Sequence, residues 1–245
     1  MAATAPNLDY GIDSPALVKN WYHRAAWSLA GGVAVWFINR QEYPATAAQL
    51  LAVLTVLALG FAAVGKYKVW SSREGKLRLR EELLNRLALG GDEKILDAGC
   101  GRGLMAIGAA KRLKTGKVTA IDTWNSQDLS GSSADAARDN AKSEGVSDRV
   151  RFETGDLRKL VYPANNFDVV VSFAALHRLA DDGERAQALG EMLRVLKPGG
   201  RILIFDTAET GYYADRLRAA GAQDVTLSPW KFLWCLPSRS ISARK

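Results

Sequence analysis

The chain has 245 residues, which is enough for one full α/β domain with a short appendage but too few for two large domains. Its net charge of +7 is compatible with nucleic-acid binding, but the positive excess is concentrated in one short segment and the signs nearly balance after residue 80. We therefore expect no nucleic-acid partner. Two cysteines and two histidines are too few for a disulfide framework or a conventional zinc site, so we expect no metal and a reducing compartment.

Two apolar stretches come early in the chain. Residues 25–38 read AAWSLAGGVAVWFI, and residues 45–65 contain no charged side chain. At about 1.5 Å of rise per residue, a helix over the second stretch crosses a hydrocarbon core of about 30 Å. Tryptophan and tyrosine residues flank both stretches, as they do at membrane–water interfaces. This pattern predicts a transmembrane helical hairpin with arms at about 21–38 and 45–65, in an N-terminal anchoring unit of residues 1–70.

Basic residues follow the second apolar stretch directly. Between residues 66 and 80 there are six of them, against Glu74 as the single acidic residue. Such a cluster beside an apolar span is typical of the cytosolic side of a membrane and attracts anionic headgroups. Lys19 and Arg24 precede the first stretch and would share that side, with Arg40 as the one basic residue of the turn. We therefore predict a membrane location, with the downstream domain and both termini in the cytosol.

This segment has two interpretations other than the transmembrane hairpin. The letters ATA at 45–47 resemble a signal-peptide cleavage site, but the apolar run continues past them and export would separate the downstream site from its cofactor. Because the first stretch is short for a span, the pair could instead form a buried or interfacial hairpin of a soluble or peripheral protein. We favour membrane association.

Strand and helix patterns alternate through the second unit, residues 71–245. An amphipathic helical pattern over 71–89 links this unit to the hairpin. The alternation predicts a doubly wound, mostly parallel sheet that binds ligands at the carboxyl ends of its strands. We expect strands at 94–97, 117–122, 149–153, 167–172, 201–206, 224–227 and 239–243, and helices at 104–113, 134–144, 184–196 and 212–220.

A glycine loop, DAGCGRG from Asp97 to Gly103, follows the first of these strands. Glycine lets the backbone turn sharply and approach a ligand closely. The spacing is GxGxG, whereas a dinucleotide site has its third glycine where this chain has Leu104. Asp122 ends the next strand, where its carboxylate can accept hydrogen bonds from both hydroxyls of a ribose. The motifs GDL at 155–157 and, later, LKPGG complete the pattern.

From about residue 80 to residue 245, these motifs and their order resemble the class I S-adenosylmethionine-dependent methyltransferases, a group that includes quinone C-methyltransferases and many small-molecule enzymes. The resemblance implies a Rossmann-like fold with a seven-stranded sheet whose last strand is antiparallel, and S-adenosylmethionine as the cofactor. By this resemblance the methionine portion would lie at Gly99, Gly101 and Gly103, with its amino group near Asp97. The ribose would lie at Asp122, and the adenine along Trp124 with its edge at Asp156 and Leu157. For Trp124, simple packing of its loop is the alternative to contact with the adenine.

His177 is the candidate catalytic residue. Methyl transfer from a sulfonium requires little acid–base assistance when the acceptor is already nucleophilic, because alignment of donor and acceptor supplies much of the rate. His177 follows the fourth strand in SFAALHRL and is the only histidine of the second unit. It could remove a proton from an oxygen, nitrogen or thiol acceptor, or it could cap or pack the turn.

Two further segments have open interpretations. The polar loop NSQDLSGSS at 125–133 is either a lid over the cofactor or a simple surface loop. The aromatic residues between Trp230 and Leu236 pack the final strands, line an apolar acceptor site or form a second membrane contact.

Taken as a whole, the sequence predicts a membrane-associated enzyme that moves a methyl group from S-adenosylmethionine to an apolar or amphiphilic small-molecule or lipid acceptor. A noncatalytic membrane-bound cofactor-binding or scaffold protein is the alternative from another class, and an NAD-dependent oxidoreductase is the third. The intact glycine loop and Asp122 favour the enzyme. The pattern indicates no particular oligomeric state.

Overall fold

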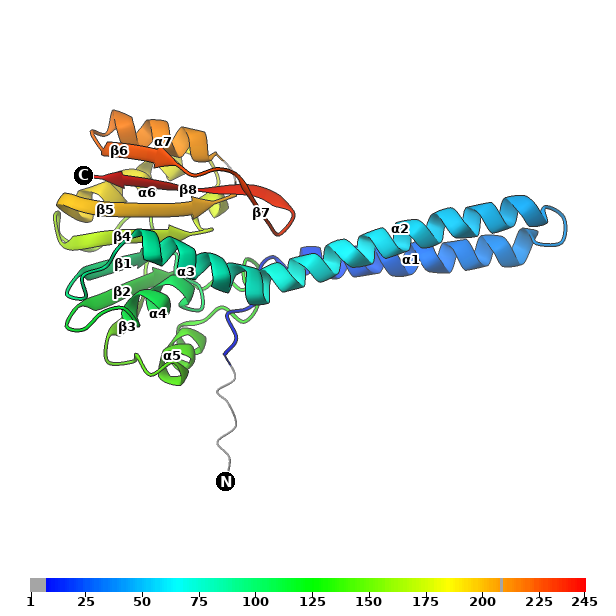
Figure 1. Ribbon diagram of the computed structural model, residues 1–245, viewed down its shortest axis with the longest axis horizontal. Helices are drawn as coiled ribbons and strands as arrows, with labels where there is room; N and C mark the ends of the chain where they lie inside the picture. The colour runs from blue at the N-terminus through cyan, green and yellow to red at the C-terminus, as the bar shows by residue number, and fades with distance from the viewer. Residues whose placement is uncertain (1–7, 208) are drawn as a thin grey trace, which may run out of the picture.

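The computed structural model describes residues 8–207 and 209–245, which form an α/β domain and a two-helix hairpin that projects from it (Figure 1). The hairpin consists of α1 (Pro15–Asn39) and α2 (Pro44–Trp70), and a proline opens each helix. The arms predicted at 21–38 and 45–65 lie inside these longer helices. In the described part of the chain, one helix, Pro44–Arg86, is long and apolar enough to cross a membrane by length and composition.

The two arms of the hairpin pack closely because small residues allow it. A Cβ atom at Gly32 would lie 3.1 Å from the Cβ of Leu54, so glycine sets the spacing there. Nearer the domain, the ring of Tyr22 lies against Gly65, where an added Cβ would come within 3.1 Å of it. The hairpin is therefore a paired structure along its length rather than two separate helices.

The second helix of the hairpin continues into the domain without a break. After Trp70 the chain forms a π-helical segment, η1 (Ser71–Gly75), and then α3 (Lys76–Arg86), which packs on the sheet. A π-helical turn contains one more residue than an α-helical turn and is common at functional junctions. The boundary between residues 70 and 71 thus lies within a continuous helix that joins the hairpin to the domain.

The sheet has the order β3-β2-β1-β4-β5-β8-β6, with β7 paired to β8. The strands from β3 to β5 are parallel, whereas β8 is antiparallel to both β5 and β6. The expected doubly wound sheet with an antiparallel last strand is confirmed. The strands are β1 (Lys94–Ala98), β2 (Lys117–Asp122), β3 (Val150–Thr154), β4 (Phe167–Phe173), β5 (Leu196–Asp206), β6 (Gln223–Leu227), β7 (Lys231–Leu233) and β8 (Leu236–Arg244).

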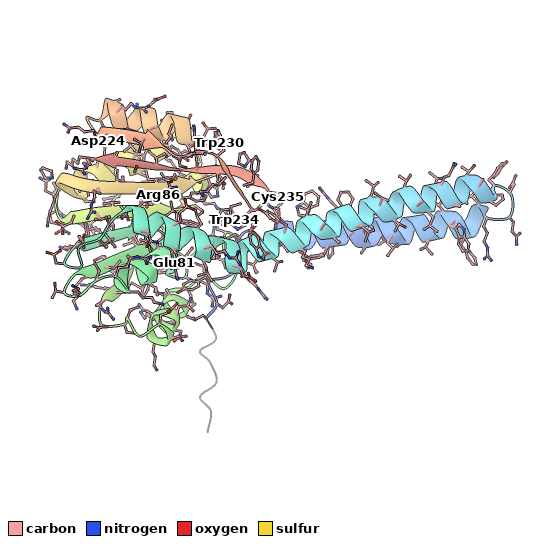
Figure 2. All side chains as sticks on the ribbon, in the orientation of Figure 1. Glu81, Arg86, Asp224, Trp230, Trp234 and Cys235 are labelled. Carbon is pink, nitrogen blue, oxygen red and sulfur yellow. The ribbon has the colours of Figure 1, made fainter. Side chains whose placement is uncertain are left out.

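The short strand β7 makes the sheet eight-stranded, which corrects the expected seven. It forms a hairpin with β8 through Trp234 and Cys235, whose φ angles are +56° and +62°. Two-residue turns of this kind usually contain Asn-Gly, so nothing in the sequence indicated one here. Trp234 is buried, its indole N–H donates to Asp13 at 3.1 Å, and its carbonyl accepts from Lys68 at 2.7 Å. These contacts hold the strained turn beside the base of the hairpin (Figure 2).

Helices cover both faces of the sheet, as the burial of β4 on both of its faces requires. Val169 and Val171 belong to the core beneath α3, α4 and α5, whereas Val170 belongs to the core beneath α6 and α7. A strand that is buried on both faces lies at the centre of the sheet. Its carboxyl end lies between two of the loops that connect strands to helices, where doubly wound sheets bind ligands. The remaining helices are α4 (Leu104–Ala110), α5 (Ala134–Ser143), a 3₁₀ turn η2 (Leu176–Arg178), α6 (Asp182–Val195) and α7 (Thr210–Ala219).

Candidate active site

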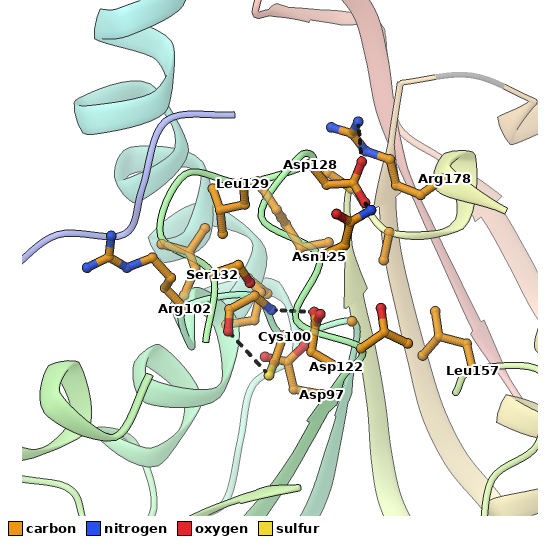
Figure 3. A pocket seen from close by; sticks show the side chains of 18 of the residues that line it. Asp97, Cys100, Arg102, Asp122, Asn125, Asp128, Leu129, Ser132, Leu157 and Arg178 are labelled. Carbon is orange, nitrogen blue, oxygen red and sulfur yellow. Dashed lines mark hydrogen bonds and ion pairs between the residues drawn. The ribbon is translucent and has the colours of Figure 1, made fainter. Parts of the chain in front are cut away.

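A cavity of about 420 Å³ lies at the carboxyl ends of the parallel strands (Figure 3). Its volume falls in the range of small-molecule sites, and its position is the one that doubly wound sheets use for ligands. Two of the predicted cofactor residues, Gly103 and Trp124, are not part of its lining. The predicted residues that do line it are Asp97, Gly99, Gly101, Asp122, Asp156 and Leu157.

The glycine loop has the backbone shape that its residue types predict. Gly99 has a φ of +85°, and a Cβ there would lie 2.3 Å from the Cβ of Ala175, so a larger residue would displace the loop after β4. Gly103 has a φ of +84° and precedes α4, and its added Cβ would lie 2.9 Å from Ile107. This last glycine therefore permits close packing of α4 on the sheet rather than contact with a ligand.

Asp97 has a buried oxygen without a partner. Its Oδ2 accepts the N–H of Ala106 at 2.8 Å, whereas its Oδ1 has no hydrogen-bond partner among the described residues. Burial, with a smaller effect from nearby Asp122, raises the pKa of Asp97 to about 7. An unpaired buried carboxylate oxygen that lines a cavity is complementary to a cation, because the cation supplies both the missing donor and the opposite charge.

Asp122 is fixed at the end of β2 by two backbone donors. Its Oδ2 accepts the N–H of Gly101 at 2.7 Å and its Oδ1 accepts the N–H of Trp124 at 2.7 Å. Burial raises the pKa of this carboxyl as well. Each oxygen retains a lone pair, so the rigid carboxylate can accept from two neighbouring hydroxyl groups.

The segment that forms this site is similar to known proteins. Residues 95–200, which contain the glycine loop and Asp122, match the family described as methyltransferase domain. These residues form a methyltransferase domain. S-adenosylmethionine, the methyl donor of such domains, fits the residues present: the unpaired oxygen of Asp97 can accept from its amino group, and the fixed carboxylate of Asp122 can accept from both hydroxyls of its ribose.

Curated relatives are also methyltransferases, and a solved structure shares the fold. Over 151 residues the chain is 36% identical to the methyltransferase GfsG of Streptomyces halstedii, covering 62% of this chain and 51% of the relative. It is 32% identical over 131 residues to the demethylmenaquinone methyltransferase of Lactiplantibacillus plantarum, covering 53% and 52%. The chain thus spans about half the length of these curated relatives. An S-adenosylmethionine-dependent methyltransferase structure from Aquifex aeolicus has the same fold, with a TM-score of 0.55 and 20% identity over 74% of this chain and 97% of that one.

Asp156 and Leu157 follow β3 and line the cavity. The carboxylate of Asp156 accepts from the guanidinium of Arg158, at 2.6 Å for the nearest pair of atoms, and Arg158 also pairs with Glu184. Arg158 holds the pKa of Asp156 below its usual range. Asp156 is therefore an ionised acceptor in the methyltransferase domain, and Leu157 beside it presents buried apolar surface.

Trp124 lies outside the cavity lining. Its φ is +62°, and its indole N–H donates to the hydroxyl of Thr154 at the end of β3, at 3.0 Å. The ring is half-buried against the core on that face of the sheet. In this arrangement the backbone N–H of Trp124, through Asp122, contributes to the site, and the indole packs its own loop.

His177 also lies outside the lining, although its neighbours Ala175 and Arg178 belong to it. Its Nδ1 is 2.5 Å from Oδ1 of Asp206, which is fully buried at the end of β5. Asp206 also accepts the backbone N–H of His177 at 3.1 Å. The carboxylate therefore fixes both the backbone and the ring of His177, and the side chain is one-fifth exposed. Such a pairing holds a histidine in one tautomer with its Nε2 available.

The N-terminal segment supplies a part of the site that the sequence did not indicate. Residues 9–14, called the strap below, run past the glycine loop, and Tyr10 and Asp13 line the cavity. Lys76 at the start of α3 is only 2% exposed and donates to the carbonyls of Tyr10 and Gly11, at 2.8 and 2.9 Å, and to Asp13 at 3.0 Å. A lysine inside a basic helical pattern gives no sign of such burial, so only the tertiary structure shows this contact.

Proposed function

We propose that this protein is a membrane-anchored methyltransferase whose acceptor is an apolar or amphiphilic small molecule or a lipid. The domain carries the chemistry, and the hairpin fixes it at the cytosolic surface of a bilayer. The observation that carries the membrane part is the surface of α2. Its most apolar 18-residue window has a mean hydropathy of 2.3, and only 11% of that window is buried by the rest of the protein.

The exposed side chains of the hairpin support this proposal. Val56, Leu59 and Ile38 are 68%, 66% and 76% exposed. Side chains project outward along both arms of the hairpin (Figure 2). A contiguous apolar surface of this extent is unstable in water and stable in hydrocarbon. At about 1.5 Å per residue, the 27 residues of α2 extend about 40 Å, which exceeds the thickness of a hydrocarbon core of about 30 Å.

Charged and aromatic residues at the two ends of the hairpin fit the same orientation. Near the domain, Lys19, Arg24 and Lys66 precede or follow the uncharged stretches. At the tip, the guanidinium of Arg40 lies over the rings of Trp36 and Phe37, at 5.1 and 4.6 Å from their centres. Basic side chains near the domain and an arginine shielded by aromatic rings at the tip are suited to two headgroup layers.

When bound, S-adenosylmethionine supplies an activated methyl group. The work of the protein is then to align the acceptor and to exclude water. The cavity wall beyond the glycine loop is formed by Phe173, Ala174 and Leu179, which present apolar surface to an acceptor. Asp97 and Asp122 hold the donor end rigidly, so that most of the rate arises from orientation.

His177 is the group that we assign to proton removal from the acceptor. Fixed by Asp206, its ring keeps Nε2 free to act as a base without reorganisation. His177 lies one residue from the cavity wall at Arg178, so we expect the acceptor to complete the contact.

One of the named relatives supports the proposal of an apolar acceptor. The protein from Lactiplantibacillus plantarum is named a demethylmenaquinone methyltransferase. A quinone acceptor of that kind partitions into a bilayer, and an enzyme anchored at the surface would find it at high local concentration. A second candidate function, as a noncatalytic scaffold, has no comparable observation in its favour, because the donor residues are all present.

The membrane part of the proposal is tested on the full-length protein by a carbonate or high-salt wash. Salt screens the basic residues but leaves apolar burial intact, so an integral hairpin stays in the membrane pellet. Deleting residues 1–70 would also remove Tyr10 and Asp13 from the cavity. We therefore prefer to replace residues 27–56 with a short glycine–serine turn. This variant keeps the contact of Trp21 with Phe61 and should be soluble yet still bind S-adenosylmethionine.

The catalytic part is tested by incubating membrane extracts with isotopically labelled donor and finding the labelled product by mass spectrometry. A labelled lipid or quinone is the expected result. The shortened variant should lose activity mainly on bilayer-dissolved acceptors and less on a short-chain soluble analogue. Release of the full-length protein by salt alone would contradict the anchor. Preference for NAD over S-adenosylmethionine in a binding titration would contradict the enzyme.

A further inference from the structure

A second cavity, of about 440 Å³, lies where the hairpin meets the domain. Three apolar side chains, Ile12, Val18 and Val69, contribute to its lining and come from the strap, α1 and α2. Lys19 and His23 are one turn apart on the same face of α1, and Arg73 of the π-helical segment lines the same cavity. No carboxylate is among the lining residues.

We propose that this cavity binds the phosphate headgroup of an anionic membrane lipid. Within residues 8–207 and 209–245, no hydrogen bond or ion pair of the protein occupies the side chains of Lys19, His23 or Arg73. Basic groups that converge without a protein partner are complementary to a phosphate diester. The apolar lining residues favour a lipid over free phosphate, because they can cover the first carbons of an acyl chain.

The position of the cavity agrees with a headgroup, and in this respect the inference rests on the proposed membrane anchor. The uncharged stretches of the two arms begin just beyond Arg24 and end just before Lys66, so the cavity lies at the headgroup level of an inserted hairpin. Tyr22 lines the cavity too, and its ring is flat against Gly65 of the other arm. Glycine at that position keeps the ring close to α2 and leaves the cavity open.

A thin wall separates this cavity from the cofactor site. The strap pairs with the loop after β2: the N–H of Ser130 donates to the carbonyl of Ile12 at 3.0 Å, and the N–H of Ile12 donates to the Ser130 hydroxyl at 2.8 Å. Ile12 and Ser130 face the second cavity, whereas the adjoining Asp13 and Leu129 face the first. Donor binding and lipid binding can therefore be measured separately.

The test uses delipidated full-length protein in detergent, titrated with phosphatidylglycerol or phosphatidylcholine and followed by native mass spectrometry. Loss of one cation from a headgroup site weakens binding about fivefold, so the double variant Lys19→Gln, Arg73→Gln should bind phosphatidylglycerol about 25-fold less tightly. The matched control, Arg24→Gln with Lys66→Gln, removes the same charge at the same end of the hairpin but outside the cavity. It should change the affinity by less than about twofold.

Three results would overturn the inference. Equal losses in both double variants would mean diffuse attraction rather than a site. Equal binding of phosphatidylcholine would remove the role of the net negative charge, and inorganic phosphate binding as tightly as phosphatidylglycerol would remove the role of the acyl chain. Calorimetric titration with S-adenosylmethionine should be unchanged in every variant. Release from membranes by salt would contradict the anchor itself and is measured independently.

Discussion

The hairpin and the domain are built from similar apolar residues but present them in opposite ways. In the domain, Ile95, Val169 and Val171 are completely buried, whereas in the hairpin Val56 and Leu59 are about two-thirds exposed. Burial of apolar surface stabilises a fold by about 25 cal/mol per Å², and the hairpin forgoes most of that gain within its own chain. The domain thus buries its apolar side chains within its own fold, whereas the hairpin leaves most of them exposed, and the proposed membrane anchor would cover them.

The largest expected effect is on the free energy of unfolding, and it is seen by comparing one phenylalanine of the domain with one of the hairpin. Phe205 on β5 is 1% exposed and stacks on Phe173 with ring centres 5.0 Å apart, whereas Phe37 in the hairpin is 62% exposed. Phe205→Ala should lower the free energy of unfolding of the domain by about 3–5 kcal/mol, because it opens a cavity in the core. Phe37→Ala should change it by less than about 0.5 kcal/mol. Denaturant unfolding in mild detergent measures both, and similar losses would mean that the hairpin packs as a second core.

The next largest effect is on turnover, and it tests whether the domain alone carries out the chemistry. If His177 acts as the proposed base, His177→Ala should lower turnover by about 10²–10⁴ at saturating acceptor. Calorimetric donor affinity and membrane retention in the same variant should stay unchanged. Asp206→Asn should give a smaller loss, since the ring remains but its tautomer is no longer fixed. A loss below about threefold for His177→Ala in a folded protein would leave His177 as a structural residue of the turn.

A smaller effect concerns the donor. Asp122→Ala should weaken binding of S-adenosylmethionine by about ten- to a hundredfold. The reason is that loss of a charged group that accepts hydrogen bonds from two hydroxyls reduces the binding free energy by about 1.5–3 kcal/mol. Asp135→Ala is the matched control, since that carboxylate is 89% exposed on α5 and lies outside the cavity. Isothermal titration calorimetry measures both. An unchanged affinity for Asp122→Ala would remove Asp122 from the donor site.

The smallest effect is a pH dependence. Because the pKa of Asp97 is raised to about 7 in the free domain, a growing share of it is protonated as the pH falls below 7. The donor amino group binds the carboxylate form, so affinity should rise with pH by at most about tenfold per unit between about 5.5 and 7, and then level off. The pKa of Asp122 is raised in the same direction, so Asp97→Asn should reduce this slope without abolishing it. A slope unchanged in that variant would assign the pH dependence to another group.

The local features of both regions were predictable from the sequence. The apolar runs, the alternation of strands and helices and the glycine loop are short-range patterns, in which each residue type directly favours a backbone conformation or an environment. All seven expected strands are present, and the loop residues Gly99 and Gly101 line the cavity together with Asp97 and Asp122. The order of motifs along the chain was enough to identify the donor.

Contacts between segments far apart in the chain, by contrast, could be found only in the folded structure. Lys76 meets Asp13 across 63 residues, and Trp234 meets the same carboxylate across 221 residues. The pairing of His177 with Asp206 and the turn at Trp234 likewise depend on packing that no local pattern encodes. The physical reason is that a sequence motif shows only which backbone conformation and which environment one segment favours. The partners that satisfy a buried lysine, an unusual turn or an oriented histidine are determined when the whole chain packs.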